Sequence, residues 1–211
     1  MVATLHRADR VVLHNISWEQ FEKLLEDLGD HCSTRIAYDN GTLEIMTPLL
    51  EHEHFKEVIG DAIKDIADEL ELDYESYGST TWRKRIKMTG VEPDNCFYFQ
   101  HEAEVRGRLD LNLNQGDPPP DLALEIDITS KSLDRFPIYA RLEVPELWCY
   151  DEGVLKIYHL RDGEYVEAKT SLALPLLPIR ELPQLIETYR TAGRRAIRRA
   201  VREWARSRVK E

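Results

Sequence analysis

Cysteine and long apolar runs are scarce in this sequence, and their scarcity excludes several classes of protein. The 211 residues include only three cysteines, which lie more than fifty residues apart, so we expect neither a disulfide framework nor a zinc knuckle. No apolar run approaches the roughly 20 residues that span a bilayer, and residues 1–12 do not resemble a cleaved secretory signal. We therefore expect a cytoplasmic protein that does not bind membranes.

The common nucleotide-binding and nucleophile motifs are also absent. The chain has no Gly-x-Ser-x-Gly elbow, no Gly-x-x-x-x-Gly-Lys-Ser/Thr loop and no Gly-x-Gly-x-x-Gly turn, which argues against nucleotide binding and serine hydrolysis by those routes. His52 and Glu53 follow each other, but Lys56 stands where a zinc-protease motif needs its second histidine.

Hydrophobic residues make up 42% of the chain and charged residues 32%, a composition typical of one globular domain with its own core. The net charge of -11 is unevenly distributed. Residues 190–211 hold nine bases and two acids, a net charge of +7, which leaves -18 on residues 1–189. An acidic body repels nucleic acid unless cations or a basic patch offset its field, so global charge neither favours nor excludes DNA as a partner.

Capping and turn signals locate the first elements. Ser17 and Gln20 form a capping box at the start of a helix predicted over 17–29. The pair Asn40-Gly41 is typical of a tight hairpin turn, and a long amphipathic helix is predicted over 51–70. The other expected elements are strands at 34–38, 42–46, 72–77, 82–88, 95–100, 122–128, 146–150, 154–160 and 164–168 and helices at 133–141 and beyond 181.

The order of these elements favours a single α/β domain with a mixed sheet, because the chain has no internal repeat and no linker. We place this domain at residues 1–189. Residues 190–211 are expected to form a basic amphipathic helix that belongs to the same domain or makes an oligomer contact.

Two acids interrupt an otherwise apolar strand. Residues 122–128 are apolar apart from Glu125 and Asp127, a pattern typical of a strand buried on both faces, and the two acids leave the same face. Because unpaired buried carboxylates are unfavourable, we expect a cation, a basic side chain or water beside them. Asp94, which follows Pro93 at the entry of another strand, is a second such position. A hard divalent cation such as Mg²⁺ takes oxygen ligands of this kind.

The start of the predicted helix 51–70 supplies further candidates. Successive helical residues are 100° apart, which places Glu51 and His52 on or beside the apolar stripe and Glu53 and Glu57 toward solvent. Glu51 and His52 can therefore face a site on the sheet. An acid at a helix N-terminus is also favoured by the helix dipole alone, so a purely structural role stays open for both.

Four separated runs of residues carry a recognisable pattern: GTLEI at 41–45, GVEPD at 90–94, PPPDLALEIDITS at 118–130 and YARLEVPELWCYD at 139–151. In this order they resemble the Uma-two family, described as putative bacterial endonucleases with the PD-(D/E)XK nuclease fold. The resemblance covers about residues 10–175. It implies a restriction-endonuclease-like α/β core, with a mixed central sheet of four strands flanked by helices, here with an additional β-hairpin and meander.

The resemblance also implies a metal site. Asp94 and Glu125 match the metal-binding acids of the family, and Glu51 matches the acidic start of its first core helix. The implied cofactor is Mg²⁺ or Mn²⁺, and the implied partner is DNA.

The basic residue of the nuclease pattern is displaced. The pattern has a lysine two residues after Glu125, where this chain has Asp127. In the family a basic residue often comes instead from the following helix, and here it is Arg135, which can hold a phosphate but cannot act as a base at neutral pH. Lys131 could substitute, although an exposed loop lysine is the simpler interpretation. The candidate catalytic residues are thus Asp94, Glu125, Asp127 and Arg135, and the candidate substrate-binding residues are Arg135, Lys131 and His52.

We therefore predict a metal-dependent endonuclease that hydrolyses phosphodiester bonds in DNA. The alternative is a catalytically silent protein of the same fold that binds nucleic acid or a protein partner. In a third interpretation Glu125 and Asp127 are structural and are neutralised by Arg83, Lys84 or Arg135.

The basic tail has two interpretations as well. Its small and apolar residues recur every three or four positions from Tyr189 onward, with the arginines on the opposite face. We favour docking on the acidic body of the same chain or of a second subunit in a homodimer. Otherwise the tail supplies the charge for DNA binding, which would make that binding strongly salt-dependent.

Overall fold

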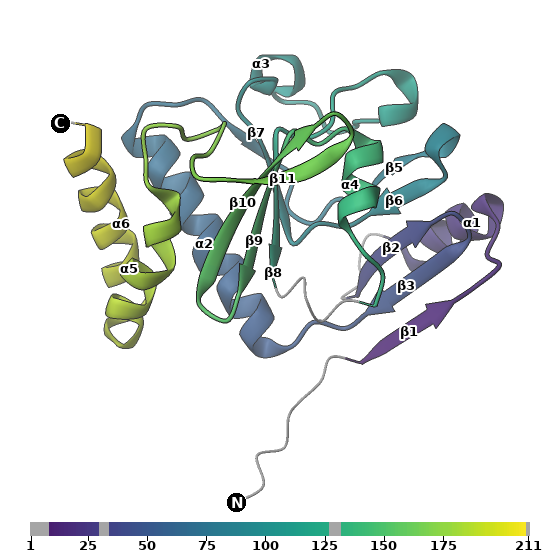
Figure 1. Ribbon diagram of the computed structural model, residues 1–211, viewed down its shortest axis with the longest axis horizontal. Helices are drawn as coiled ribbons and strands as arrows, with labels where there is room; N and C mark the ends of the chain where they lie inside the picture. Colours follow the sequence, from purple (N-terminus) through teal and green to yellow (C-terminus); the bar gives the residue numbers. More distant parts are fainter. Residues whose placement is uncertain (1–8, 30–33, 127–131, 210–211) are drawn as a thin grey trace, which may run out of the picture.

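Two β-sheets and six α-helices make up the part of the chain that the structure, a computed structural model, describes: residues 9–29, 34–126 and 132–209 (Figure 1). The first sheet is antiparallel. Its five strands lie in the order β1, β3, β2, β6, β5: Arg10–Leu13, Thr42–Met46, Arg35–Asp39, Thr89–Val91 and Trp82–Lys84.

The second sheet is the mixed sheet that the sequence predicts. Its strands lie in the order β11, β10, β9, β8, β7, β4: Glu164–Ala168, Val154–Arg161, Glu146–Asp151, Leu122–Ile126, Asn95–Tyr98 and Glu75–Ser76. Only β8 and β9 run parallel, while β9, β10 and β11 form the predicted meander. The four-stranded core is thus extended to six strands.

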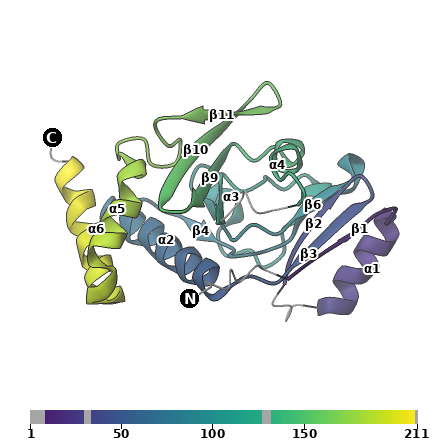
Figure 2. The same cartoon turned by 60° about the horizontal axis from the view of Figure 1, so that its bottom comes forward.

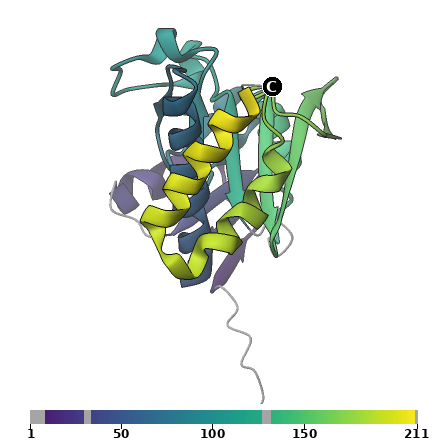
Figure 3. The same ribbon diagram turned by 90° about the vertical axis from the view of Figure 1, so that its left-hand side faces the viewer.

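Helices cover both sheets. On one face of the mixed sheet lie α2, α5 and α6, on the other lies α4, and α1 packs on the antiparallel sheet (Figures 1 and 3). The helices are α1 (Trp18–Leu28), α2 (Leu50–Glu69), α3 (Glu102–Val105), α4 (Phe136–Leu142), α5 (Leu182–Tyr189) and α6 (Arg194–Val209). None of the helices in the described ranges combines the length and the apolar character that a bilayer crossing needs.

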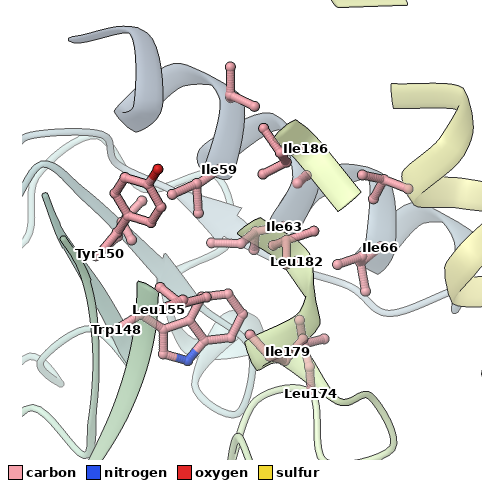
Figure 4. Close-up of a cluster of buried hydrophobic side chains, with 14 of the residues drawn as sticks. Ile59, Ile63, Ile66, Trp148, Tyr150, Leu155, Leu174, Ile179, Leu182 and Ile186 are labelled. Atoms are coloured by element: carbon pink, nitrogen blue, oxygen red, sulfur yellow. The ribbon is translucent and has the colours of Figure 1, made fainter. Parts of the chain in front are cut away.

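The main core lies between α2 and the mixed sheet. Isoleucines 59, 63 and 66 of α2 meet Trp148 and Leu155 of the sheet, and α5 closes the cluster with Leu182 and Ile186 (Figure 4). On β8, Leu122 and Leu124 belong to this cluster, whereas Ala123 packs in the cluster under α4. This strand is therefore buried on both faces, as its apolar sequence predicts up to Ile126.

The local signals at the N-terminal side are confirmed. Ser17 caps α1, and both hydrogen bonds of its capping box with Gln20 are present. At the hairpin between β2 and β3, Asn40 and Gly41 adopt φ angles of 44° and 89°, the positive values that a tight turn of this kind requires.

Several predicted boundaries were wrong. The strand expected at 72–77 is reduced to Glu75–Ser76, and the one expected at 82–88 turns into a 3₁₀ helix after Lys84. The sequence reasoning missed β1 and β6, which are only four and three residues long. The tail does not form one continuous helix from Tyr189, because Gly193 at φ 89° separates α5 from α6.

The two sheets meet at one segment of the chain. After β6 of the antiparallel sheet, residues 92–94 lead directly into β7 of the mixed sheet. Glu92 N donates to Ile36 O of β2 at 2.9 Å, and Asp94 N donates to Leu124 O of β8 at 3.0 Å. We call this crossing, residues 92–94, the seam.

The basic helix α6 packs along α2 of the same chain (Figure 3). Ile197, Val201 and Ala205 join the main core. Above them four arginines pair with acids of α2: Arg194 with Asp61, Arg198 and Arg202 with Asp65, and Arg206 with Glu69.

Asp65 provides a test of this helix pairing. Its side chain is fully buried. Burial alone would raise its pKa, but the hydrogen bonds from Arg198 and Arg202 outweigh that effect and hold the pKa below its ordinary value. Because the folded-state pKa is depressed, the stabilisation is complete above the unfolded pKa of about 3.9 and is lost as pH falls through the folded value.

We expect Asp65→Asn to lower the free energy of unfolding at pH 7 by about 2 kcal/mol, the scale of a charged hydrogen bond. The difference from the unmodified protein should shrink below pH 4. Denaturant titrations at pH 7 and pH 3 measure both effects. Asp61→Asn is the matched control, since Asp61 is partly exposed and pairs with Arg194. An equal loss in the two variants would contradict the role given to Asp65.

Candidate active site

The two acids singled out by the sequence lie together at the carboxyl end of β8. Asp94 and Glu125 are both fully buried. Asp94 ends the seam, and its Oδ2 accepts a hydrogen bond from the backbone N–H of Ile126 at 2.7 Å. One carboxylate therefore holds the end of the strand that carries the other.

Glu125 is held from α4. The hydroxyl of Tyr139 donates a short hydrogen bond to its Oε1. Burial raises the pKa of this tyrosine, and the negative charge of Glu125 raises it further, so Tyr139 remains a protonated donor at neutral pH.

Arg135 directly precedes α4 and has no solvent-exposed side-chain surface. Its Nη2 donates to Glu44 Oε1 of β3 at 2.8 Å, and its Nη1 donates to Ile36 O at 3.4 Å. Burial alone would lower the pKa of Arg135, but the charges of Glu125 and Glu44 outweigh this effect and raise it. This geometry fits a buried counter-ion for two acids. The role of Arg135 in holding a phosphate stays a prediction.

Asp94 has basic neighbours from the other side. Arg35 Nε of β2 lies 3.4 Å from Asp94 Oδ1, and its Nη2 donates to Glu53 Oε1 at 2.9 Å. His52 Nε2 of α2 lies 3.2 Å from Asp94 Oδ2. Glu53, expected to point toward solvent, is 36% exposed, and Arg35 also joins it to Asp94.

A groove of about 760 Å³ opens beside His52. The first turns of α2 separate α5 from β3 at this end of the molecule (Figure 2). Apolar side chains, including Phe55 and Tyr150, share the lining with four acids, and no lysine or arginine of the described ranges lines it. The acids are Glu51, Asp151, Glu152 and Glu187.

The structure describes some of the remaining predicted site residues but not all of them. Glu51 is exposed on the groove wall, and nothing in its surroundings tests its role as a metal ligand. Asp127 and Lys131 lie outside the described residues. Arg83 pairs with Glu22 and Lys84 with Glu143. Of the three basic residues considered as partners for Glu125, Arg135 is therefore the one that lies beside it in the described structure.

The donor chemistry of the site suits a magnesium-like ion. Mg²⁺ typically binds through one or two carboxylates and keeps several waters, whereas calcium and structural zinc sites need more protein ligands. Asp94 and Glu125 supply two carboxylates, and His52 adds a buried ring nitrogen. Over the described ranges, no three His, Cys, Asp or Glu side chains converge into a ready-made metal site.

Sequence reasoning missed Glu44, Arg35 and Tyr139. Glu44 carried a usable signal, because it interrupts the apolar strand β3 just as Glu125 interrupts β8. It is fully buried, and its Oε2 accepts from the backbone N–H groups of Ser132 and Leu133 at 2.8 and 3.1 Å. For Arg35 and Tyr139 the partners are distant in sequence, so no local pattern reveals them.

A family comparison matches these observations. The chain belongs to the Uma2 family, described as putative restriction endonuclease, whose model matches residues 18–190. The resemblance seen in the sequence motifs is thus confirmed, and so is the expected α/β class with a mixed central sheet between helices.

Among solved structures, the chain is similar to a putative nuclease belonging to DUF820 from Anabaena variabilis ATCC 29413, solved at 1.96 Å resolution. The sequences are 13% identical, the TM-score is 0.48, and the match covers 87% of this chain and 97% of that chain. No curated protein matches this chain.

Proposed function

We propose that this protein is an endonuclease that hydrolyses phosphodiester bonds in DNA with Mg²⁺ or Mn²⁺ as cofactor. One observation carries the proposal: two fully buried carboxylates, Asp94 and Glu125, lie at the same end of neighbouring strands in a member of a nuclease family. Such acids are the ligands that a hard divalent cation prefers.

Asp94 and Glu125 would hold the cation, with Glu51 on the groove wall as a third acid. When bound, the ion lowers the pKa of a water molecule and offsets the negative charge that develops on the phosphate. The chain's own groups orient this site. Tyr139 fixes Glu125 Oε1, and Arg35 and the Ile126 amide fix the two oxygens of Asp94.

The proton transfer and the phosphate contact rest on residues near the site. Asp127 and Lys131 follow β8 in sequence and are proposed to complete the catalytic set, with Lys131 contacting the substrate. If Arg135 keeps its buried position beside Glu44, it does not contact the phosphate directly. It then affects the phosphate only through its charge interaction with Glu125.

A second candidate function is a silent member of the family that binds nucleic acid or a protein partner. It is favoured by the basic neighbours of both carboxylates, Arg35 for Asp94 and Arg135 for Glu125. With those partners the acids can stay buried without a metal.

Cleavage of supercoiled plasmid and branched DNA by the purified protein, with Mg²⁺, Mn²⁺ or EDTA, separates the two functions. We expect metal-dependent cleavage that falls at least about 10³-fold in Glu125→Gln, since a metal-bound site stabilises charge at the reacting phosphate. Isothermal titration should show weaker Mn²⁺ binding in the same variant.

Glu146→Gln is the matched control. Glu146 is also a fully buried acid of the mixed sheet, but it begins β9 at the opposite end and binds Trp148 and the amides of 172 and 173. Equal cleavage by the unmodified protein and Glu125→Gln would reject the nuclease assignment and leave the silent binding protein.

A further inference from the structure

His52 is a buried polar group for which the described structure supplies no hydrogen-bond partner. Its side chain is 8% exposed, and neither ring nitrogen makes a hydrogen bond with a described residue. Nε2 lies 3.2 Å from Asp94 Oδ2, yet the arrangement does not meet hydrogen-bond geometry. Buried imidazole nitrogens without partners are unfavourable, which points to a ligand that is shared with Asp94.

The separation of these two atoms suits neighbouring ligands of one ion. Two donors that each stand about 2.1 Å from an octahedral cation, at right angles, are roughly 3.0 Å apart. The 3.2 Å between His52 Nε2 and Asp94 Oδ2 is close to this value.

The far side of the imidazole ring also resembles a metal-binding histidine. Glu53 Oε1 lies 3.9 Å from Nδ1 and accepts a hydrogen bond from Arg35, while Glu53 Oε2 accepts one from Lys56. Histidine ligands commonly donate their second ring N–H to a carboxylate, which sets the tautomer that leaves the other nitrogen free to bind. At 3.9 Å this pair is longer than a hydrogen bond, so Glu53 is a carboxylate neighbour of Nδ1 in this structure.

We propose that His52 is a direct ligand of the divalent cation, through Nε2, beside Asp94 Oδ2. This inference shares one premise with the proposed function, which is that the site binds a divalent cation. An imidazole ligand makes the site favour Mn²⁺ over Mg²⁺, because nitrogen donors suit transition metals whereas Mg²⁺ prefers oxygen. The role differs from the substrate contact expected from the sequence.

Pulsed electron paramagnetic resonance of the full-length protein with one equivalent of MnCl₂ tests the ligand directly. We expect electron spin-echo modulation from a directly bound ¹⁴N nucleus, which changes on ¹⁵N-histidine labelling. This signal should vanish in His52→Gln and persist in His54→Gln. His54 is a suitable control because it lies on the same helix, is partly buried and has an unpartnered Nε2 among the described residues.

Calorimetric titrations give a second readout. We expect His52→Gln to weaken Mn²⁺ binding at least about tenfold and Mg²⁺ binding much less, in line with the loss of one nitrogen interaction at a metal. Circular dichroism shows whether the variant remains folded.

Two results would overturn the proposal: bound Mn²⁺ without nitrogen coupling in the unmodified protein, or nitrogen coupling that survives in folded His52→Gln. The first needs no variant, so the proposal stays testable even if His52→Gln fails to fold. Failure to bind Mn²⁺ at all would overturn it too. Loss of DNA cleavage has no bearing on this signal, so the ligand and the nuclease activity can fail separately.

Discussion

Replacing Arg135 by methionine is expected to lower the free energy of unfolding by about 3–5 kcal/mol, the usual consequence of removing one partner of a buried ion pair. Neither Arg135 nor Glu44 has side-chain surface in contact with solvent, so water cannot solvate the carboxylate that is left behind. Glu125 loses the same positive charge. Denaturant unfolding followed by circular dichroism measures the loss.

A lysine at this position separates the two roles of Arg135. Lysine keeps the charge but lacks the planar fork that reaches both Glu44 and the Ile36 carbonyl. We expect a loss of about 1–2 kcal/mol of stability with little change in cleavage per folded molecule. A changed cleavage rate or pH profile at unchanged stability would instead assign Arg135 to the phosphate.

Arg83→Met serves as the control for burial. Arg83 also forms an ion pair, with Glu22, but the two side chains are 39% and 30% exposed. Pairs of this kind contribute less than about 1 kcal/mol. If both variants lost the same stability, burial would not be the cause of the Arg135 effect.

Deletion of residues 190–211 is expected to remove about 5 kcal/mol or more of stability, a large share of the roughly 5–15 kcal/mol that separates a typical folded domain from its unfolded chain. The deletion takes Ile197, Val201 and Ala205 out of the main core and exposes the side of α2 that they cover. It also removes both arginines that bind Asp65. Thermal unfolding and the yield of soluble protein measure the effect.

The same truncation tests the two interpretations of the basic tail. Size-exclusion chromatography with light scattering reports whether a homodimer dissociates, and fluorescence anisotropy at several salt concentrations reports DNA affinity. A truncated protein that stays folded, keeps its oligomeric state and loses salt-dependent DNA binding would give α6 the DNA-binding role.

The exchange of Arg195 and Arg199 for glutamine is the matched control for the truncation. Both arginines are exposed, and Arg199 Nε lies 3.9 Å from Glu203 Oε1. This double variant should keep the stability of the unmodified protein, since exposed pairs contribute little.

The elements that the sequence predicts well are those that depend on near neighbours. The capping box of α1 and the Asn40-Gly41 turn each need only a few adjacent residues. The misplaced or missed strands β1, β4 and β6 are two to four residues long and depend on partners far along the chain. Their pairing is decided by tertiary context, to which local propensity is a weak guide.

The site shows the same division. Glu125 could be found because an acid in a buried strand is conspicuous, and Asp94 because it follows a proline at the start of a strand. The partners of these acids come from other elements: Arg35 from β2, Tyr139 from α4 and His52 from α2. The sequence therefore predicts the acids and names His52 and Arg135 as candidates near them, but it does not reveal Arg35 or Tyr139.

Because of the contacts around the seam, residues of the two sheets are expected to change together in evolution. Arg35 and Glu44 come from the antiparallel sheet. Their partners are Asp94, which belongs to the seam, and Arg135, which directly precedes α4. Replacing one residue of such a pair leaves the other as a buried charge without its partner. Natural variants are thus expected to exchange Arg35 together with Asp94, and Glu44 together with Arg135. The antiparallel sheet therefore cannot be lost or replaced while Asp94 and Glu125 are retained.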